Sequence, residues 1–214
     1  MTAETIRTGV PQANPHMRQT LEAYFDIIGP MSGIGSWLAT EFDFSPYKTV
    51  IDAGGGLGGV SVVLTEAWPH LRATVVDLPE VIPLSQRYIA EMKAADRVEA
   101  IAGDLVSGPL TGSFDVAILC RLLHVLPAEQ ARQVVINIFN VVKSGGVIYV
   151  PSTLILDDSL LSPPSAVAYG LALINLSEGG QAYTEPVYRT WLAEAGFVNI
   201  ERVNESTMMA RKPA

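Results

Sequence analysis

The sequence predicts an α/β protein built on a seven-stranded, mostly parallel sheet with helices on both faces. Two observations predict this fold class. Short, nearly continuous apolar segments rich in valine and isoleucine alternate with segments of helical periodicity, as in a parallel sheet that is covered on both sides. The last two strand-like segments have no helix between them, so we expect them to pair as an antiparallel hairpin at the end of the chain.

Each expected strand is short and is followed by a helix, a turn or the hairpin. The five parallel strands are expected at 47–53, 72–77, 98–102, 114–120 and 146–150. Helices are expected at 57–68, from Pro79 to 92, from Pro127 to 142 and at 184–195, with Lys143 and Gly145 at the C-terminal end of the third. The hairpin strands are expected at 197–203 and 207–211.

The first 40 residues differ in pattern from the rest of the chain. Residues 1–15 are polar and contain two prolines, which indicates an arm or linker. Residues 17–40 show helical spacing that Gly29-Pro30 interrupts, which predicts two short helices. We therefore expect an N-terminal arm with short helices over 1–40 and a single α/β domain over 41–214.

Composition excludes several classes of protein. The 214 residues carry a net charge of −8, which argues against a general affinity for nucleic acid or an anionic membrane. One cysteine, Cys120, leaves no disulfide framework and no cysteine-based metal site, and we predict no metal. No apolar stretch reaches the roughly 18 residues of a membrane span, and no secretory signal is visible, so we predict a cytoplasmic protein.

The clearest motif is a glycine-rich loop where the first strand meets its helix. It begins at Asp52 and contains Gly54, Gly56 and Gly59 in the pattern G-x-G-x-x-G. Glycines there let the backbone turn tightly and approach a ligand. Asp77 ends the next strand, where a carboxylate binds a ribose hydroxyl pair, so loop and acid indicate an adenosine-containing ligand. They do not decide between a nicotinamide dinucleotide and S-adenosylmethionine.

Two features favour S-adenosylmethionine. A carboxylate at Asp52 suits the cationic amino group of that ligand and sits poorly beside a pyrophosphate. The C-terminal hairpin is the second feature, because dinucleotide-binding folds keep alternating strand and helix. Asp104 and Leu105 end the third strand at the same edge, where a carboxylate accepts from an adenine amino group. The alternatives are a glycine loop that serves only packing, NAD binding, and an Asp104 that only caps a turn.

Several segments occur in the order and at the spacing of a known family. They are DAGGGLG at 52–58, DLPEV at 77–81, GDL at 103–105, Leu123-His124, Gly145-Gly146, and GGQAYTEPVYRTWLAEAGF at 179–197. With them the chain resembles the catalytic domain of the S-adenosylmethionine-dependent small-molecule O-methyltransferases, the group with caffeate and hydroxyindole O-methyltransferases. The fold implied is the Rossmann-like class I methyltransferase. The family's N-terminal dimerisation domain has no counterpart in the sequence.

The resemblance implies roles for individual residues. Asp77, followed by Leu78, would bind the ribose hydroxyls, and Asp104 with Leu105 the adenine. The Gly54–Gly56 loop would face the methionine part, and the backbone near Cys120 and Arg121 would meet its amino group.

His124 falls on the family's catalytic histidine, and it follows the fourth strand, close to the point where the sheet order reverses. A neutral histidine can take the proton of an acceptor hydroxyl at pH 7. The supporting residues differ from the family's, however. Where the family has His-Asp-Trp, this sequence has His124-Val125-Leu126. The family's carboxylate at the end of the fifth strand is replaced near Ser152, and a glutamate of its later glycine-containing segment is replaced by Ala182. The alternative is a histidine that only packs at a strand end.

The sequence thus predicts methyl transfer from S-adenosylmethionine to a hydroxyl of a small aromatic or polyketide-like metabolite. Phe25, Met31 and Asn175 are candidate substrate contacts. The alternative is core packing for Phe25 and Met31, and a hydrogen bond to a backbone group for Asn175. Three other interpretations stay open: C- or N-methylation, a regulatory subunit that binds the cofactor without catalysis, and an NAD-dependent oxidoreductase. The low charged fraction of 17% leaves room for a homo-oligomer or a separate partner subunit.

Overall fold

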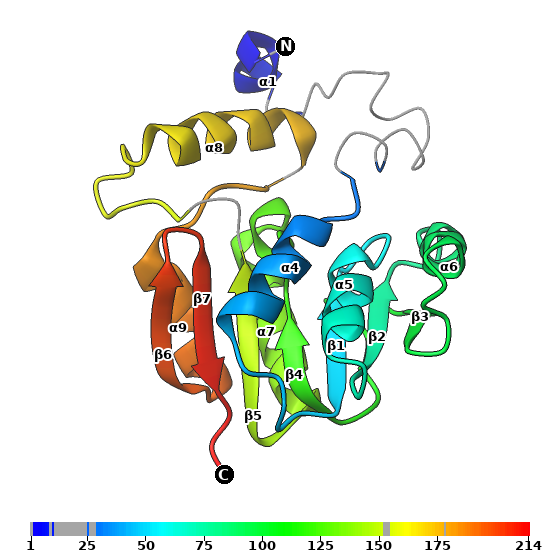
Figure 1. Ribbon diagram of the computed structural model, residues 1–214. Coiled ribbons are helices and arrows are strands. Elements are labelled where there is room, and N and C mark those ends of the chain that lie inside the picture. The colour runs from blue at the N-terminus through cyan, green and yellow to red at the C-terminus, as the bar shows by residue number, and fades with distance from the viewer. Residues whose placement is uncertain (1, 9, 11–24, 26–28, 152–154, 178) are drawn as a thin grey trace.

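A computed structural model describes residues 2–8, 10, 25, 29–151, 155–177 and 179–214, and it confirms the predicted fold class (Figure 1). The sheet has seven strands in the order β3-β2-β1-β4-β5-β7-β6. β1 to β5 are parallel, and β7 runs antiparallel to both β5 and β6. The strands are β1 (Thr49–Ala53), β2 (Arg72–Asp77), β3 (Val98–Ala102), β4 (Phe114–Ile118), β5 (Val142–Pro151), β6 (Val198–Asn204) and β7 (Thr207–Arg211).

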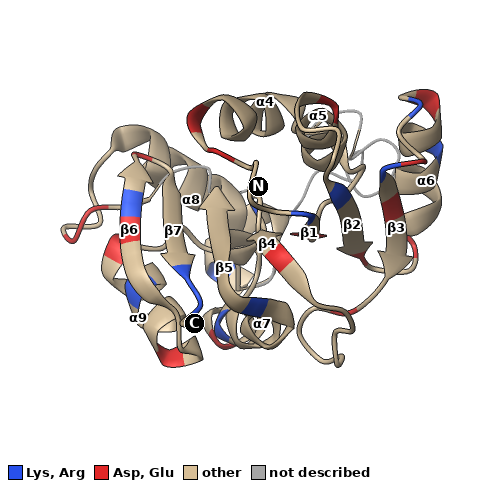
Figure 2. Ribbon diagram, turned by 60° about the horizontal axis from the view of Figure 1, so that its bottom comes forward, with Lys and Arg blue, Asp and Glu red and all other residues tan. Residues whose placement is uncertain are grey.

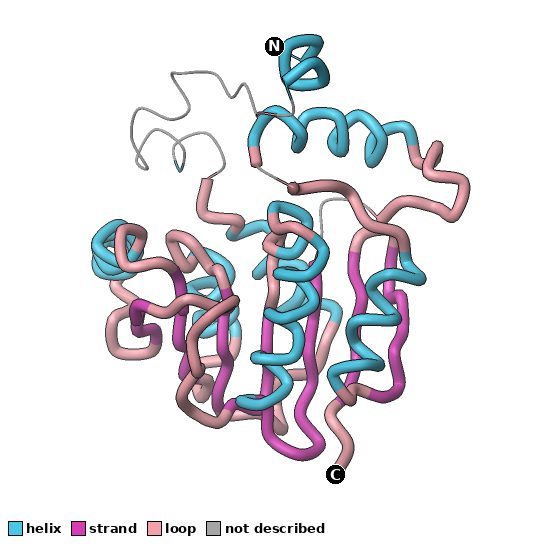
Figure 3. The backbone as a smooth tube through the Cα atoms, turned by 180° about the vertical axis from the view of Figure 1, so that it is seen from behind, coloured by secondary structure: helices cyan, strands magenta, loops and turns pink. Residues whose placement is uncertain are grey.

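Helices cover both faces of the sheet. One face carries α4 (Ser32–Glu41), α5 (Gly59–Ala67) and α6 (Ile82–Glu91), and the other carries α7 (Ala128–Val141) and α9 (Glu185–Ala195), which stand in front of the sheet in Figure 3. Two more helices, α1 (Thr2–Thr8) and α8 (Pro164–Leu176), lie beyond the carboxyl ends of the parallel strands. A ligand held at that edge of the sheet therefore faces α8.

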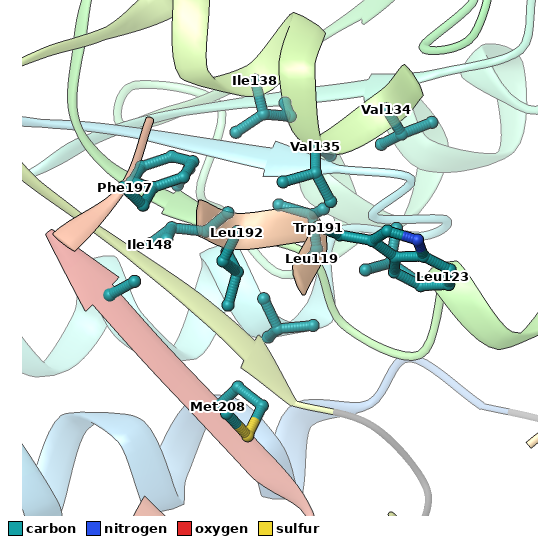
Figure 4. Packing of buried hydrophobic residues seen from close by; sticks show 14 of the residues in the cluster. Leu119, Leu123, Val134, Val135, Ile138, Ile148, Trp191, Leu192, Phe197 and Met208 are labelled. Atoms are coloured by element: carbon teal, nitrogen blue, oxygen red, sulfur yellow. The ribbon is translucent and has the colours of Figure 1, made fainter. Parts of the chain in front are cut away.

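Each face of the sheet has its own apolar core. Ile138 of α7, Leu192 of α9 and Ile148 of β5 belong to one cluster, in which Trp191, Phe197 and Met208 also pack (Figure 4). Leu38 of α4 and Leu64 of α5 are fully buried in the other. These side chains recur at the helical spacing that predicted the helices, so burial of one apolar stripe per helix fixes the layers.

Two expected boundaries were wrong by three residues or more, and several others by one or two. The helix predicted from Pro79 begins at Ile82, with Pro83 in its first turn, where a missing N–H costs nothing. Strand β5 begins at Val142 rather than 146, because Val142 pairs with Phe114 of β4 and leaves Lys143 and Gly145 in the strand, not at the end of a helix.

The N-terminal segment is partly described. Residues 2–8 of the predicted arm form α1, which is joined to α8 by a 2.7 Å hydrogen bond from the Thr5 hydroxyl to Asn175 Oδ1. The second of the two short helices predicted over 17–40 is α4, and most of the first lies outside the described residues.

Charges are interspersed rather than gathered, with both signs on the outer helices and strands (Figure 2). Helix α8 contains no charged residue. Among the described residues, no helix is long and apolar enough to cross a membrane.

Candidate functional site

The glycine-rich loop joins the end of β1 to the start of α5 in a backbone conformation that favours glycine. Gly54, Gly56 and Gly58 have φ values of 68°, 56° and 83°. The Gly54 N–H donates to the Val76 carbonyl of β2 over 2.8 Å. A Cβ on Gly56 would lie 2.8 Å from the Phe25 ring. A side chain at these positions is therefore both strained and crowded.

Asp77 closes the loop, so the structure brings together the two parts of the predicted cofactor motif. Its Oδ2 accepts from the Gly56 N–H and its Oδ1 from the Leu78 N–H, each over 2.8 Å. Burial raises the pKa of this carboxyl above its ordinary value, although both N–H groups favour the ionised form. Each carboxylate oxygen keeps a lone pair for a further donor. Leu78 itself is exposed.

Asp52 lies beneath the loop rather than on it. Its side chain is fully buried, and its Oδ2 accepts from the Ser61 hydroxyl of α5 over 2.8 Å. A Cβ on Gly55 would come within 2.6 Å of Asp52 Cγ. Burial raises the pKa of Asp52 to about 6. Oδ1 has no hydrogen-bond partner among the described residues, so the predicted contact with a ligand's amino group, which stays a prediction, falls to that oxygen.

Asp104 caps a turn after β3. Its carboxylate accepts from the N–H of Val106 over 2.8 Å and from the Ser107 hydroxyl, which lowers its pKa. It is exposed and keeps room for a further donor, so its predicted bond to an adenine amino group stays a prediction. Leu105, in contrast, packs into the core cluster with α7, which favours the packing alternative for that side chain.

Past β4 the chain turns back toward the loop. Cys120 is buried, which raises its pKa to about 12 and leaves an unreactive thiol. Arg121 adopts a φ of 54°, and its N–H donates to the Pro151 carbonyl of β5 over 2.7 Å. Its guanidinium reaches Met31, with 3.3 Å from Nη1 to the sulfur. The structure therefore places Met31 beside the predicted cofactor residue Arg121.

His124 sits in a 3₁₀ turn after β4 and is 2% exposed. Its Nε2 lies 3.1 Å from the hydroxyl of Tyr169 on α8, and the two rings meet edge to face with centroids 5.3 Å apart. Burial, and then the positive charge of Arg121, lower the pKa of His124 to about 4. The imidazole is therefore neutral at pH 7, and the same two causes make it a weaker base than an exposed histidine.

Tyr169 is the site residue that the sequence analysis missed. Arg121 Nη2 lies 3.5 Å from its hydroxyl, and the guanidinium carbon lies 5.8 Å from the centre of its ring. The available signal was a tyrosine on the uncharged apolar segment of α8. From the same segment we had selected Asn175, whose side chain instead binds Thr5 of α1 and donates to the Leu171 carbonyl over 3.3 Å.

The structure places two of the three remaining residues that the sequence analysis named. Phe25 is buried against Gly56, so it lies at the glycine loop. Ser152, near the replaced carboxylate, lies outside the described residues. Ala182 follows Gln181, whose N–H donates to the His124 carbonyl over 2.9 Å, so the altered segment still contacts the histidine through its backbone. Among the described residues, no group of three His, Cys, Asp or Glu is placed to hold a metal ion.

Comparisons with known proteins identify the family of the chain. A family model described as an O-methyltransferase domain matches residues 26–198. The chain is 30% identical to the tetracenomycin polyketide synthesis 8-O-methyl transferase TcmO of Streptomyces glaucescens, over 98% of this chain and 65% of that protein. It is 31% identical to the 3-hydroxy-5-methyl-1-naphthoate 3-O-methyltransferase of Streptomyces sahachiroi, over 78% of this chain and 48% of that protein.

A solved structure has the same fold. Human N-acetylserotonin methyltransferase, in complex with SAM, aligns with a TM-score of 0.84 and 24% identity over 100% of this chain and 66% of that one. The chain spans about half to two thirds of the length of these relatives. With a family model that covers most of its residues, the chain belongs to the O-methyltransferase domain family.

Proposed function

We propose that this chain transfers a methyl group from S-adenosylmethionine to a hydroxyl of a small aromatic or polyketide-like metabolite. One observation carries the proposal: the Gly54–Gly58 loop is hydrogen-bonded to Asp77 at the carboxyl ends of β1 and β2, and a neutral His124 follows the adjacent strand β4. The polyketide and naphthoate O-methyltransferases among the relatives support the acceptor class.

The residues at the loop fit this cofactor. Asp77 offers acceptor lone pairs to a ribose hydroxyl pair, and the backbone of the loop is open to close approach because it is glycine. Asp52 Oδ1 is a buried acceptor with no hydrogen bond among the described residues, which suits a cationic amino group more than a pyrophosphate. When bound, the cofactor supplies a methyl group already activated by the sulfonium.

The protein's own residues then have two tasks, which are to align the acceptor with the methyl group and to remove the acceptor's proton. His124 is neutral, and Tyr169 and Arg121 stand beside it. The uncharged helix α8 gives an aromatic acceptor an apolar surface near these groups. The proposal includes a cytoplasmic location. It also includes assembly, either as a homo-oligomer or with a separate partner subunit.

The test is a methyl-transfer assay with S-adenosylmethionine and three panels of acceptors. The first contains phenols and naphthols, the second aromatic amines, and the third compounds that can be methylated only at carbon. S-adenosylhomocysteine and methylated product are measured by mass spectrometry. We expect product from the hydroxyl panel, and none from an Asp77→Ala variant. Product only from the amine or carbon panel would replace O-methylation by N- or C-methylation. Cofactor binding without turnover on any panel would favour the non-catalytic subunit.

A further inference from the structure

Tyr169 of helix α8 covers the ring nitrogen Nε2 of His124. The imidazole is 2% exposed, whereas Tyr169 is partly exposed and covers Nε2 at 3.1 Å. A general base works within about 2.6–3.2 Å of the group whose proton it takes, or through one bridging water. An acceptor that reaches this edge of the sheet therefore meets the Tyr169 hydroxyl before it meets the imidazole.

The three side chains form a hydrogen-bond chain with one favoured direction. A guanidinium only donates, so Arg121 Nη2 places a donor 3.5 Å from the Tyr169 oxygen. The tyrosine hydroxyl has a single hydrogen, and the neutral His124 offers Nε2 as its acceptor. When His124 carries its hydrogen on Nδ1, the chain runs from Arg121 to Tyr169 to His124, and Nε2 then receives a proton through Tyr169.

We propose that Tyr169 is a catalytic residue that relays the acceptor's proton to His124. The inference rests on the proposed function. As the acceptor oxygen forms its bond to the methyl carbon, the carbon–sulfur bond breaks and sulfur keeps that electron pair. The acceptor's proton passes to Tyr169 Oη, and the proton of Tyr169 passes to His124 Nε2. The imidazolium then returns a proton through Tyr169 to water.

Arg121 has a defined part in this relay. Negative charge develops on Tyr169 Oη while its own proton is leaving and the acceptor's proton is arriving. The guanidinium is 3.5 Å from that oxygen and is already in place, so it stabilises the charge without reorganisation. Tyr169 thus contacts His124, and Arg121 contacts Tyr169.

The relay is tested by single-turnover methyl transfer at saturating cofactor, with a series of phenols whose pKa values span the assay pH. The variants are Tyr169→Phe, His124→Ala and the double variant. Tyr47→Phe is the matched control, because it removes a hydroxyl that also faces an arginine, Arg211 at 3.3 Å, on the opposite edge of the sheet. We expect Tyr169→Phe to slow protonated phenols by ~10²-fold, as loss of general base catalysis does.

Three comparisons decide the outcome. The relay requires that the loss vanish for phenols already ionised at the assay pH, that the double variant be no slower than His124→Ala, and that Tyr47→Phe match the wild type. An equal loss for protonated and ionised phenols would overturn the relay in favour of a structural role. Faster turnover in Tyr169→Phe would overturn it too, because the tyrosine would then only obstruct the histidine.

A readout without turnover supports the same decision. The ¹⁵N resonances of His124, assigned with a His124→Asn variant, report which ring nitrogen accepts a hydrogen bond. We expect Tyr169→Phe to shift the Nε2 resonance, while S-adenosylhomocysteine still binds as to the wild type. An unchanged resonance would contradict the hydrogen-bond chain. If the wild type methylates no hydroxyl at all, the proposed function is wrong. That result is distinguishable from failure of the relay, in which the wild type is active and the Tyr169→Phe comparison fails.

Discussion

The two sides of the candidate site are built in different ways. On the cofactor side, main-chain N–H groups of the glycine loop bind Asp77 and the Val76 carbonyl of strand β2, and these partners lie within one βαβ segment. On the acceptor side, Arg121, His124, Met31 and Tyr169 come from three separate parts of the chain and meet through side-chain contacts.

This difference shows that a short sequence motif can specify the cofactor side of such a site but not the acceptor side. A loop held by its own backbone has one geometry for any sequence that keeps the glycines and the acid. A cluster of side chains from distant elements depends on how α4 and α8 pack, and each residue in it can change while the fold persists. We therefore expect substitutions on the cofactor side to disturb folding and binding, and those on the acceptor side to change chemistry.

The largest expected effect is at Gly59, where α5 begins. A Cβ there would lie 2.0 Å from the Pro30 carbonyl oxygen, which is backbone and cannot rotate away. Gly59→Ala is expected to lower the free energy of unfolding by about 3 kcal/mol or more. Gly33→Ala is the matched control, because it places a methyl in open space on α4 and should stabilise by up to about 1 kcal/mol. Denaturant titration measures both, and equal stability of the two variants would contradict the packing described.

The next effect is a pair of opposite pH dependences. His124 has a folded pKa of about 4, below its ordinary 6.5, so its contribution to the free energy of unfolding rises as pH increases from 4 to 6.5. Asp52 has a folded pKa of about 6, above its ordinary 3.8, so its contribution falls as pH increases from 3.8 to 6. Each change amounts to about 3 kcal/mol at most. In the wild type the two nearly cancel.

Substitution should separate these two contributions. As the pH rises from 4 to 6, the free energy of unfolding of His124→Asn should fall relative to the wild type. That of Asp52→Asn should rise relative to the wild type over the same range. Urea titrations at four pH values give the differences, in which the other carboxylates cancel. Parallel behaviour of the two variants would show that at least one of these groups titrates normally.

Asp77→Asn should weaken binding of S-adenosylhomocysteine by roughly ten- to a hundredfold. The amide keeps the shape of the carboxylate but loses the charge and one acceptor, and a hydrogen bond to a charged group is worth about 1.5–3 kcal/mol. Asp96→Asn, which alters only a surface pair with Arg97, is the control. Calorimetric titration measures both, and unchanged affinity for Asp77→Asn would remove Asp77 from the cofactor site.

The smallest effect is expected where α1 meets α8. Thr5→Val removes the buried hydroxyl that binds Asn175 and should cost about 1 kcal/mol. Faster amide exchange in α8, with unchanged binding of S-adenosylhomocysteine, is the predicted signature in hydrogen-exchange mass spectrometry. Weaker binding of that ligand would show instead that α1 and α8 support the cofactor side.

The sequence allowed much of the fold to be predicted, for identifiable reasons. Strands β2 and β3 were placed residue for residue, because both are short, mainly apolar segments bounded by polar turns. The start of β5 was misplaced, since Val142 continues the apolar period of α7 and only its pairing with Phe114 shows that it belongs to the strand. Tyr169 was missed because its partners lie 45 and 48 positions away, a distance that periodicity does not register.

The most direct test of the account is calorimetric titration of the purified chain with S-adenosylhomocysteine, with NAD as the parallel ligand. The geometry of the loop, Asp77 and the buried Asp52 predicts micromolar binding of S-adenosylhomocysteine and no binding of NAD. Binding of NAD in its place, or of neither ligand, would contradict the assignment of this loop to S-adenosylmethionine.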